Sequence, residues 1–158
     1  MASKPKSRKM RKPVPANYEI EIQDWGVYFH LATTLGRSRA HDGDYAEDSC
    51  LFLYGKVLSP SIKDVTKVEL NIWERPELND HWKNTPSEKP PSSVGMLQIL
   101  RDKITLHGIC WVPERLFRNI FEATAVGKIK YVSVNGEKLR WGRGWIANIS
   151  FSTSREEE

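Results

Sequence analysis

Apolar and polar residues alternate with a period of two along most of this chain, and this pattern limits its fold more than any other feature. In YEIEIQ, Tyr18, Ile20 and Ile22 alternate with polar residues, as in a β-strand with one face in water. The apolar residues change parity after this segment, so we expect a β-bulge or bend at Asp24. Further extended segments follow, namely CLFLYGKVLS, VTKVELNIWE, SVGMLQIL, KITLHGICWV, KIKYVSVN and WIANISFSTS.

Only the segment near residues 113–125 has the period of an α-helix. Its apolar face consists of Leu116, Phe117, Ile120 and Phe121. Pro113 suits the first helical position, and Gly127 suits a position beyond the last turn. One helix cannot supply the crossovers of a parallel α/β sheet. The sequence therefore predicts an all-β, mainly antiparallel fold, either a β-sandwich or a partly open barrel, of seven or eight strands with one short helix near 113–125.

Two tight turns are predicted between the extended segments. A hairpin turn at Arg101-Asp102 would join SVGMLQIL to KITLHGICWV. Asn135-Gly136 also lies between alternating runs, and Asn-Gly favours two-residue hairpin turns because both residues accept positive φ. The run CLFLYG is apolar on both parities, which predicts a central strand covered on both faces.

The length of 158 residues fits a single domain, which we expect to be one β-sandwich spanning residues 17–153. Residues 1–16 contain few apolar side chains and predict a disordered basic tail, whereas residues 154–158 predict an acidic end. No apolar run is long enough to span a bilayer, and no apolar segment of a secretory signal follows the basic residues. We therefore expect a soluble cytoplasmic protein without membrane contact.

The basic tail is the most distinctive feature of the composition. Its cations are Lys4, Lys6, Arg8, Lys9, Arg11 and Lys12. Of the 24 basic residues in the chain these six lie in the tail, so residues 17–158 hold 18 against 20 acidic residues. Clustered cations contact phosphates and release counterions, so weak nucleic-acid association through the tail is one functional hypothesis.

The segment KLRWGRGW interleaves cations and aromatic residues at Arg140, Trp141, Arg143 and Trp145. Aromatic platforms with basic flanks bind single-stranded nucleic acids, so Arg140 and Arg143 join the tail as candidate contacts. The structural alternative buries residues 139, 141, 145 and 147 in the core, with a turn or bulge at residues 142–144.

The segment RSRAHDGDYAEDSC is a candidate for hydrolytic or metal-dependent catalysis, through His41, Asp42, Asp44 or Glu47. Its spacing does not match an EF-hand loop, because Ala46 stands where an oxygen ligand is needed. Motifs typical of serine hydrolases, zinc proteases or nucleotide-binding proteins are absent from the sequence. We expect Cys50 and Cys110 to be buried free thiols, and we predict no catalytic residue, cofactor or metal.

Two polar loops, residues 37–49 and 75–93, therefore lead to the main hypothesis. This is a small binding or interaction module without catalysis, which presents these loops to a protein partner. Trp82 and His81 are the candidate partner contacts, because an aromatic residue in a polar loop can anchor an interface. A homo-oligomer is a further expectation, since an exposed edge strand such as residues 18–23 could pair across a dimer.

Overall fold

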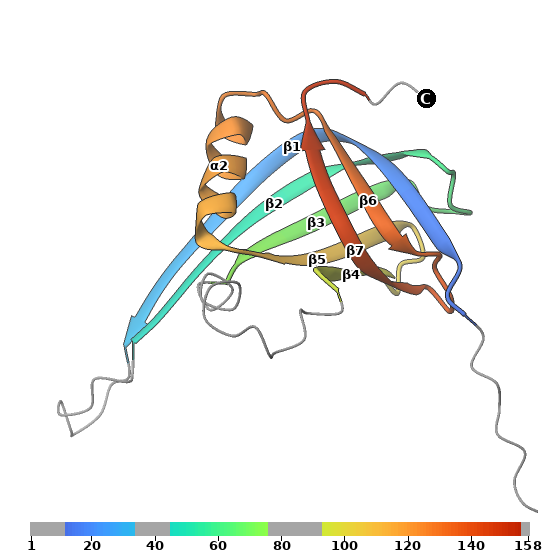
Figure 1. Cartoon of the computed structure of the whole chain (residues 1–158), viewed down its shortest axis with the longest axis horizontal. Helices are drawn as coiled ribbons and strands as arrows, with labels where there is room; N and C mark the ends of the chain where they lie inside the picture. Colours follow the sequence, from blue (N-terminus) through green and yellow to red (C-terminus); the bar gives the residue numbers. More distant parts are fainter. Residues whose placement is uncertain (1–11, 34–44, 76–92, 156–158) are drawn as a thin grey trace, which may run out of the picture.

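The computed structural model describes residues 12–33, 45–75 and 93–155, which form a closed mixed barrel with one helix (Figure 1). The elements are β1 (Pro15–Thr33), β2 (Tyr45–Ser59), β3 (Lys67–Glu74), β4 (Gly95–Ile99), β5 (Thr105–Val112), α2 (Glu114–Ala125), β6 (Tyr131–Glu137) and β7 (Arg143–Ser152). The strand order is β1-β2-β3-β5-β4-β7-β6, and every neighbouring pair is antiparallel except β3 and β5. The predicted all-β fold with one short helix is confirmed, and the barrel is closed.

The core fills the inside of the barrel with aliphatic side chains, because alternate residues of each strand point inward. The fully buried ones include Ile20, Leu51, Leu53, Leu70, Ile72, Leu106 and Ile146. The central position predicted for CLFLYG is confirmed, since β2 pairs with both β1 and β3. Its outer face is only partly covered, because Phe52 is half-buried and Tyr54 is exposed.

The barrel has two different ends. The turns at residues 60–66, 100–104 and 138–142 lie at one end together with the start of β1, and we call this the turn end. Helix α2 connects β5 to β6 at the other end, where it buries Phe117 and Ile120. Pro113 is the N-cap of this helix and not its first residue, while Gly127 has a φ of 72°, as its predicted place beyond the last turn requires.

Strands β1 and β2 continue together beyond the helix end as a two-stranded ribbon (Figure 1). The predicted irregularity at Asp24 is confirmed by a register shift between Ile22 and Asp24. The prediction of an exposed edge at residues 18–23 is wrong, because residues 19–21 pair with β2 on one side and β6 on the other. Pairing with β6 ends near Ile22, whose N–H donates to the Lys130 carbonyl over 2.8 Å.

The predicted hairpin turn at Asn135-Gly136 is also wrong. Both residues lie inside β6, next to a register shift between β6 and β7. A Cβ atom at Gly136 would clash with the backbone oxygen of Trp145. Glycine therefore stands here because the backbone of β7 approaches closely at a bulge, and not because a turn needs positive φ.

The hairpin predicted at Arg101-Asp102 is confirmed between β4 and β5. Asp102 fixes this turn, because its Oδ1 accepts hydrogen bonds from the N–H groups of Ile104 and Thr105, each over 3.0 Å. Its Oδ2 accepts a 2.6 Å bond from the Thr105 hydroxyl. This hydroxyl bond, more than the backbone bonds, lowers the pKa of Asp102.

Cys50 and Cys110 are both buried free thiols, as predicted. Burial raises the pKa of each thiol to about 12. Within the part of the chain that the structure describes, no helix is long and apolar enough to cross a bilayer.

Candidate nucleic-acid interface

The β6–β7 hairpin closes on two residues at the turn end, Trp141 and Gly142. Arg140 and Arg143 exchange both backbone hydrogen bonds across the turn, with N···O distances of 2.8 and 3.1 Å. Trp141 has a φ of 55° and Gly142 a φ of 75°, so both central residues are left-handed, as in a type I′ turn. The preferred residues at the first of these positions are Asn, Asp and Gly, so a tryptophan there carries a conformational cost.

Trp141 is 91% exposed, so its indole ring has almost no packing to offset that cost. The interpretation that placed residues 139, 141, 145 and 147 in the core is therefore wrong. Leu139 is half-buried, while Trp145 is 51% exposed on the outer face of β7 and Ala147 is exposed. The core residue of this strand is Ile146, because side chains alternate between the faces of a strand.

Exposed cations lie on the hairpin that carries the two indoles and on the segment beside it. Arg140, Arg143 and Lys138 are exposed on the β6–β7 hairpin, and Lys12 is exposed just before β1. The Lys138 N–H donates to the Val14 carbonyl over 2.7 Å, which ties the hairpin to the segment that carries Lys12. The hairpin and the end of the basic tail therefore belong to one surface.

The neighbouring β4–β5 turn adds Arg101 and Lys103, both exposed. This turn lies beside the first, because the Ile99 N–H donates to the Gly142 carbonyl over 2.8 Å. Asp102 also lies here, but its carboxylate is occupied by the hydrogen bonds that fix its own turn. The turn end thus presents more positive than negative side chains to an approaching ligand.

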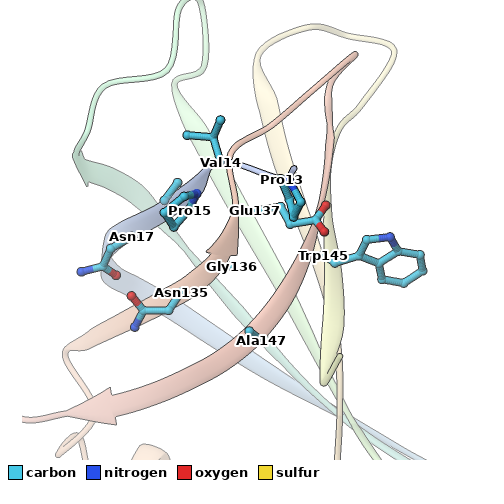
Figure 2. Close-up of a pocket in the computed structure, with 10 residues that line it drawn as sticks. Pro13, Val14, Pro15, Asn17, Asn135, Gly136, Glu137, Trp145 and Ala147 are labelled. Atoms are coloured by element: carbon cyan, nitrogen blue, oxygen red, sulfur yellow. The ribbon is translucent and has the colours of Figure 1, made fainter. Parts of the chain in front are cut away.

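Two adjoining grooves run beside the start of β1. The larger, of about 580 Å³, is lined by residues 13–17 on one side and by residues of β6 and β7 on the other, including Trp145 (Figure 2). The smaller, of about 400 Å³, is lined by Lys12, Lys138 and Arg140 among others. Glu137 lines both grooves and is the acidic side chain in their walls.

Most of the remaining residues predicted from the sequence, for nucleic-acid binding and for the other functions, lie outside the described part of the chain. These are Lys4, Lys6, Arg8, Lys9 and Arg11 of the tail, His41, Asp42 and Asp44 of the acidic segment, and His81 and Trp82 of the 75–93 loop. Of the tail cations, Lys12 is described.

The acidic segment differs from its prediction where it is described. Residues 45–49 belong to β2, so the predicted loop at 37–49 ends before them, and Glu47 and Asp48 are strand residues. Asp48 Oδ2 lies 3.7 Å from His30 Nδ1 on the paired strand, with both side chains about half-exposed. Among the described residues, no group of three or more His, Cys, Asp or Glu side chains could hold a metal ion.

His107 has a structural environment on the outer face of β5. Its Nδ1 lies 3.4 Å from the amide nitrogen of Gln98, and its Nε2 lies 4.0 Å from Glu69. The His107 side chain therefore has a partner on each neighbouring strand and is only 13% exposed.

The sequence predicted Lys12, Arg140 and Arg143 as nucleic-acid contacts from two distant segments, and the structure brings all three to the turn end. Arg101, Lys103 and Lys138 were missed. Their proximity depends on closure of the barrel, which places β4 beside β7 and β1 beside β6. The charged turn at residues 101–103 is evident in the sequence. Alternation does not specify strand order, however, so it does not show that this turn lies beside the β6–β7 turn.

Comparison with models of known protein families, with characterised proteins and with solved structures finds no match.

Proposed function

We propose that the turn end binds single-stranded nucleic acid. The observation that carries this proposal is Trp141, an almost fully exposed indole in a left-handed conformation, held between Arg140 and Arg143. Strained residues persist where the surrounding structure holds them in place, and they are frequent at ligand-binding sites. A tryptophan without packing gives no stability in return, which favours a role in contact with a ligand.

The chemistry of the turn end suits unpaired bases. Exposed indole faces at Trp141 and Trp145 are platforms on which bases stack, with about 1–3 kcal/mol per stacked base. Bases in a duplex are already stacked on their neighbours and offer no free face. The guanidinium groups of Arg140 and Arg143 add contacts to phosphates and to base faces.

The basic tail strengthens this proposal because it joins the barrel at Lys12, which lines the smaller groove beside Arg140. The cations that precede Lys12 in the sequence supply phosphate contacts without base specificity. The tail would thus raise affinity for any nucleic acid, whereas the tryptophans would favour single strands.

The test is fluorescence anisotropy with a labelled oligothymidine and with a duplex of the same length, across a salt series. We expect tighter binding to the single strand, with an affinity that falls steeply as salt rises. The variant Arg140→Gln/Arg143→Gln should lower the magnitude of the salt slope by about 0.7 for each lost phosphate contact.

Lys128→Gln/Lys130→Gln is the matched control, because both residues are exposed cations at the opposite end of the barrel. It should leave the affinity and the slope unchanged. Equal binding to duplex and single strand that disappears when residues 1–12 are removed would contradict the proposal, because the tail alone would then account for binding.

A further inference from the structure

The ribbon beyond the barrel has an open strand edge. Strand β6 covers β1 only as far as Ile22, and β1 continues to Thr33 with β2 on its other side. Among the described residues, no strand lies along the outer edge of residues 24–33. Because hydrogen bonding alternates in an antiparallel pair, every second residue of this segment directs its N–H and C=O groups away from β2.

An apolar stripe runs along this open edge. Trp25, Val27, Phe29 and Leu31 share the face that continues the inside of the barrel, and they are 39%, 39%, 59% and 66% exposed. The ring of Phe121 on α2 contacts Trp25 and Phe29 edge to face, with centroid distances of 6.3 and 5.9 Å. Exposure of the stripe is higher toward the far end of β1, at Phe29 and Leu31, than at Trp25 and Val27.

On this face the residues of β2 are buried, whereas their partners on β1 are exposed. Leu53, Leu51 and Ser49 are the β2 partners of Trp25, Val27 and Phe29, and they are all buried. The stripe is therefore open on the side where a further strand would lie. Each exposed stripe residue would gain a neighbour if a strand added to β1.

Beyond Asp24 and its register shift, the edge of β1 lacks the features that normally prevent strand addition. Natural edges carry charged residues, prolines or bulges, whereas residues 25–33, WGVYFHLAT, contain no Lys, Arg, Asp, Glu or Pro. The other edge of the ribbon contrasts with it, because β2 carries Glu47 and Asp48 before its pairing with β3 begins at Cys50. One edge of the ribbon is thus protected and the other is suited to pairing.

We propose that this edge pairs with the same edge of a second copy of the chain, antiparallel across a two-fold axis. Such an interface is isologous, and the axis keeps the stripes of both copies on one face of a continuous sheet. With Tyr28 on the axis, Trp25 faces the partner's Leu31 and Val27 faces the partner's Phe29. This register pairs all four stripe residues with one another, each pair joining an aromatic to an aliphatic side chain.

The order of residues in the stripe favours a second copy as the occupant, because the register centred on Tyr28 sets each aromatic side chain against an aliphatic one. Each chain has a formal charge of +4, and like charges oppose self-association. The paired segment adds no such repulsion, because residues 25–33 contain no Lys, Arg, Asp or Glu. The ribbon also leaves the barrel at the helix end, so pairing through β1 leaves the turn end of each copy uncovered.

The first experiment measures the mass of the full chain by analytical ultracentrifugation over a range of concentrations. We expect the mass of two chains. Leu31→Lys should raise the dissociation constant by about 100-fold, because it removes an apolar side chain from each copy and places two ammonium groups in the stripe.

The control for this substitution is Val126→Lys. Val126 is 68% exposed at the end of α2, so the two substitutions add the same charge at equally exposed apolar positions. The control should remain a dimer. A wild-type monomer, or a dimer that Leu31→Lys leaves intact, overturns the proposal; a monomer would leave the edge to an extended segment of another protein.

A second experiment tests the register. Cys50 is the β2 partner of Tyr28 and could capture a cysteine placed there, so the test uses a Cys50→Ala background. In that background Tyr28→Cys places one cysteine of each copy beside the axis, where the Cα separation of about 4.5–5.5 Å in an antiparallel pair permits a disulfide. We expect this variant to form a covalent dimer on mild oxidation. Tyr54 is also an exposed tyrosine on one of the two ribbon-forming strands, but it lies away from the axis, so Tyr54→Cys should not form a covalent dimer. Equal crosslinking of the two variants overturns the register.

Discussion

Arg140 and Arg143 face each other across the β6–β7 turn and exchange both backbone hydrogen bonds, 2.8 and 3.1 Å long. This pairing leaves two residues for the turn and forces Trp141 into a left-handed conformation. It also places Arg140 and Arg143 directly before and after the two turn residues, one of which carries the exposed indole. The strain at Trp141 and the cationic surroundings of its ring thus have one structural cause.

Replacing Trp141 should raise the stability of the chain and lower its affinity for single-stranded nucleic acid. Trp141→Asn creates an Asn-Gly pair, the preferred sequence for a type I′ turn, and should raise the free energy of unfolding by about 1 kcal/mol. The same variant should weaken binding to oligothymidine by about tenfold, because one stacking platform is lost. Urea denaturation and fluorescence anisotropy measure the two effects. Loss of stability in this variant would show that the indole packs in the folded state.

Two glycines in strands should respond differently to the same substitution. Gly136→Ala should destabilise the chain by about 2 kcal/mol or more, because the added methyl group meets the backbone of β7 and strands must separate. Gly26→Ala is the matched control, since a Cβ at Gly26 meets no atom within 4 Å. It should be neutral or slightly stabilising. Thermal unfolding of both variants, at one chain concentration, gives the comparison.

Acid should weaken the β4–β5 turn through Asp102. Hydrogen bonds from Thr105 and Ile104 lower the pKa of this carboxyl in the folded state, so the unfolded chain binds its proton more readily. The stabilisation is present above the unfolded pKa of about 3.9 and is lost as pH falls through the lower folded pKa. Asp102→Asn should therefore show a smaller loss of stability below about pH 4 than the wild type. Parallel acid-unfolding curves that differ only by a constant offset would contradict this role.

Local patterns predicted much of the fold. Alternation located the strands, the change of period located α2, and the parity change at Asp24 located the bulge that starts the ribbon. The prediction of a turn at Asn135-Gly136 was wrong because glycine is needed for more than one physical reason. Glycine also permits close approach of two backbones, and sequence does not distinguish that need from a need for positive φ.

The candidate interface was predictable only in pieces. Arg140, Arg143 and Lys12 were visible as cations, but their common surface depends on the pairing of β1 with β6, which joins residues more than a hundred positions apart in the sequence. The exposure of Trp141 was not predicted, because the turn was expected at residues 142–144, whereas its two central residues are Trp141 and Gly142. The open edge of β1 was misplaced, since strand order decides which residues lie unpaired.

The two native cysteines should be unreactive in the folded protein. Burial raises the pKa of Cys50 and Cys110 to about 12, so almost no thiolate forms at neutral pH, and thiolate is the species that attacks disulfide reagents. A colorimetric thiol assay should therefore detect no rapid reaction in the native chain and two reactive thiols in guanidinium chloride. Since reaction requires the strands around each thiol to separate, its rate below the unfolding transition reports local opening. Rapid reaction of one thiol under native conditions would contradict the burial of that residue.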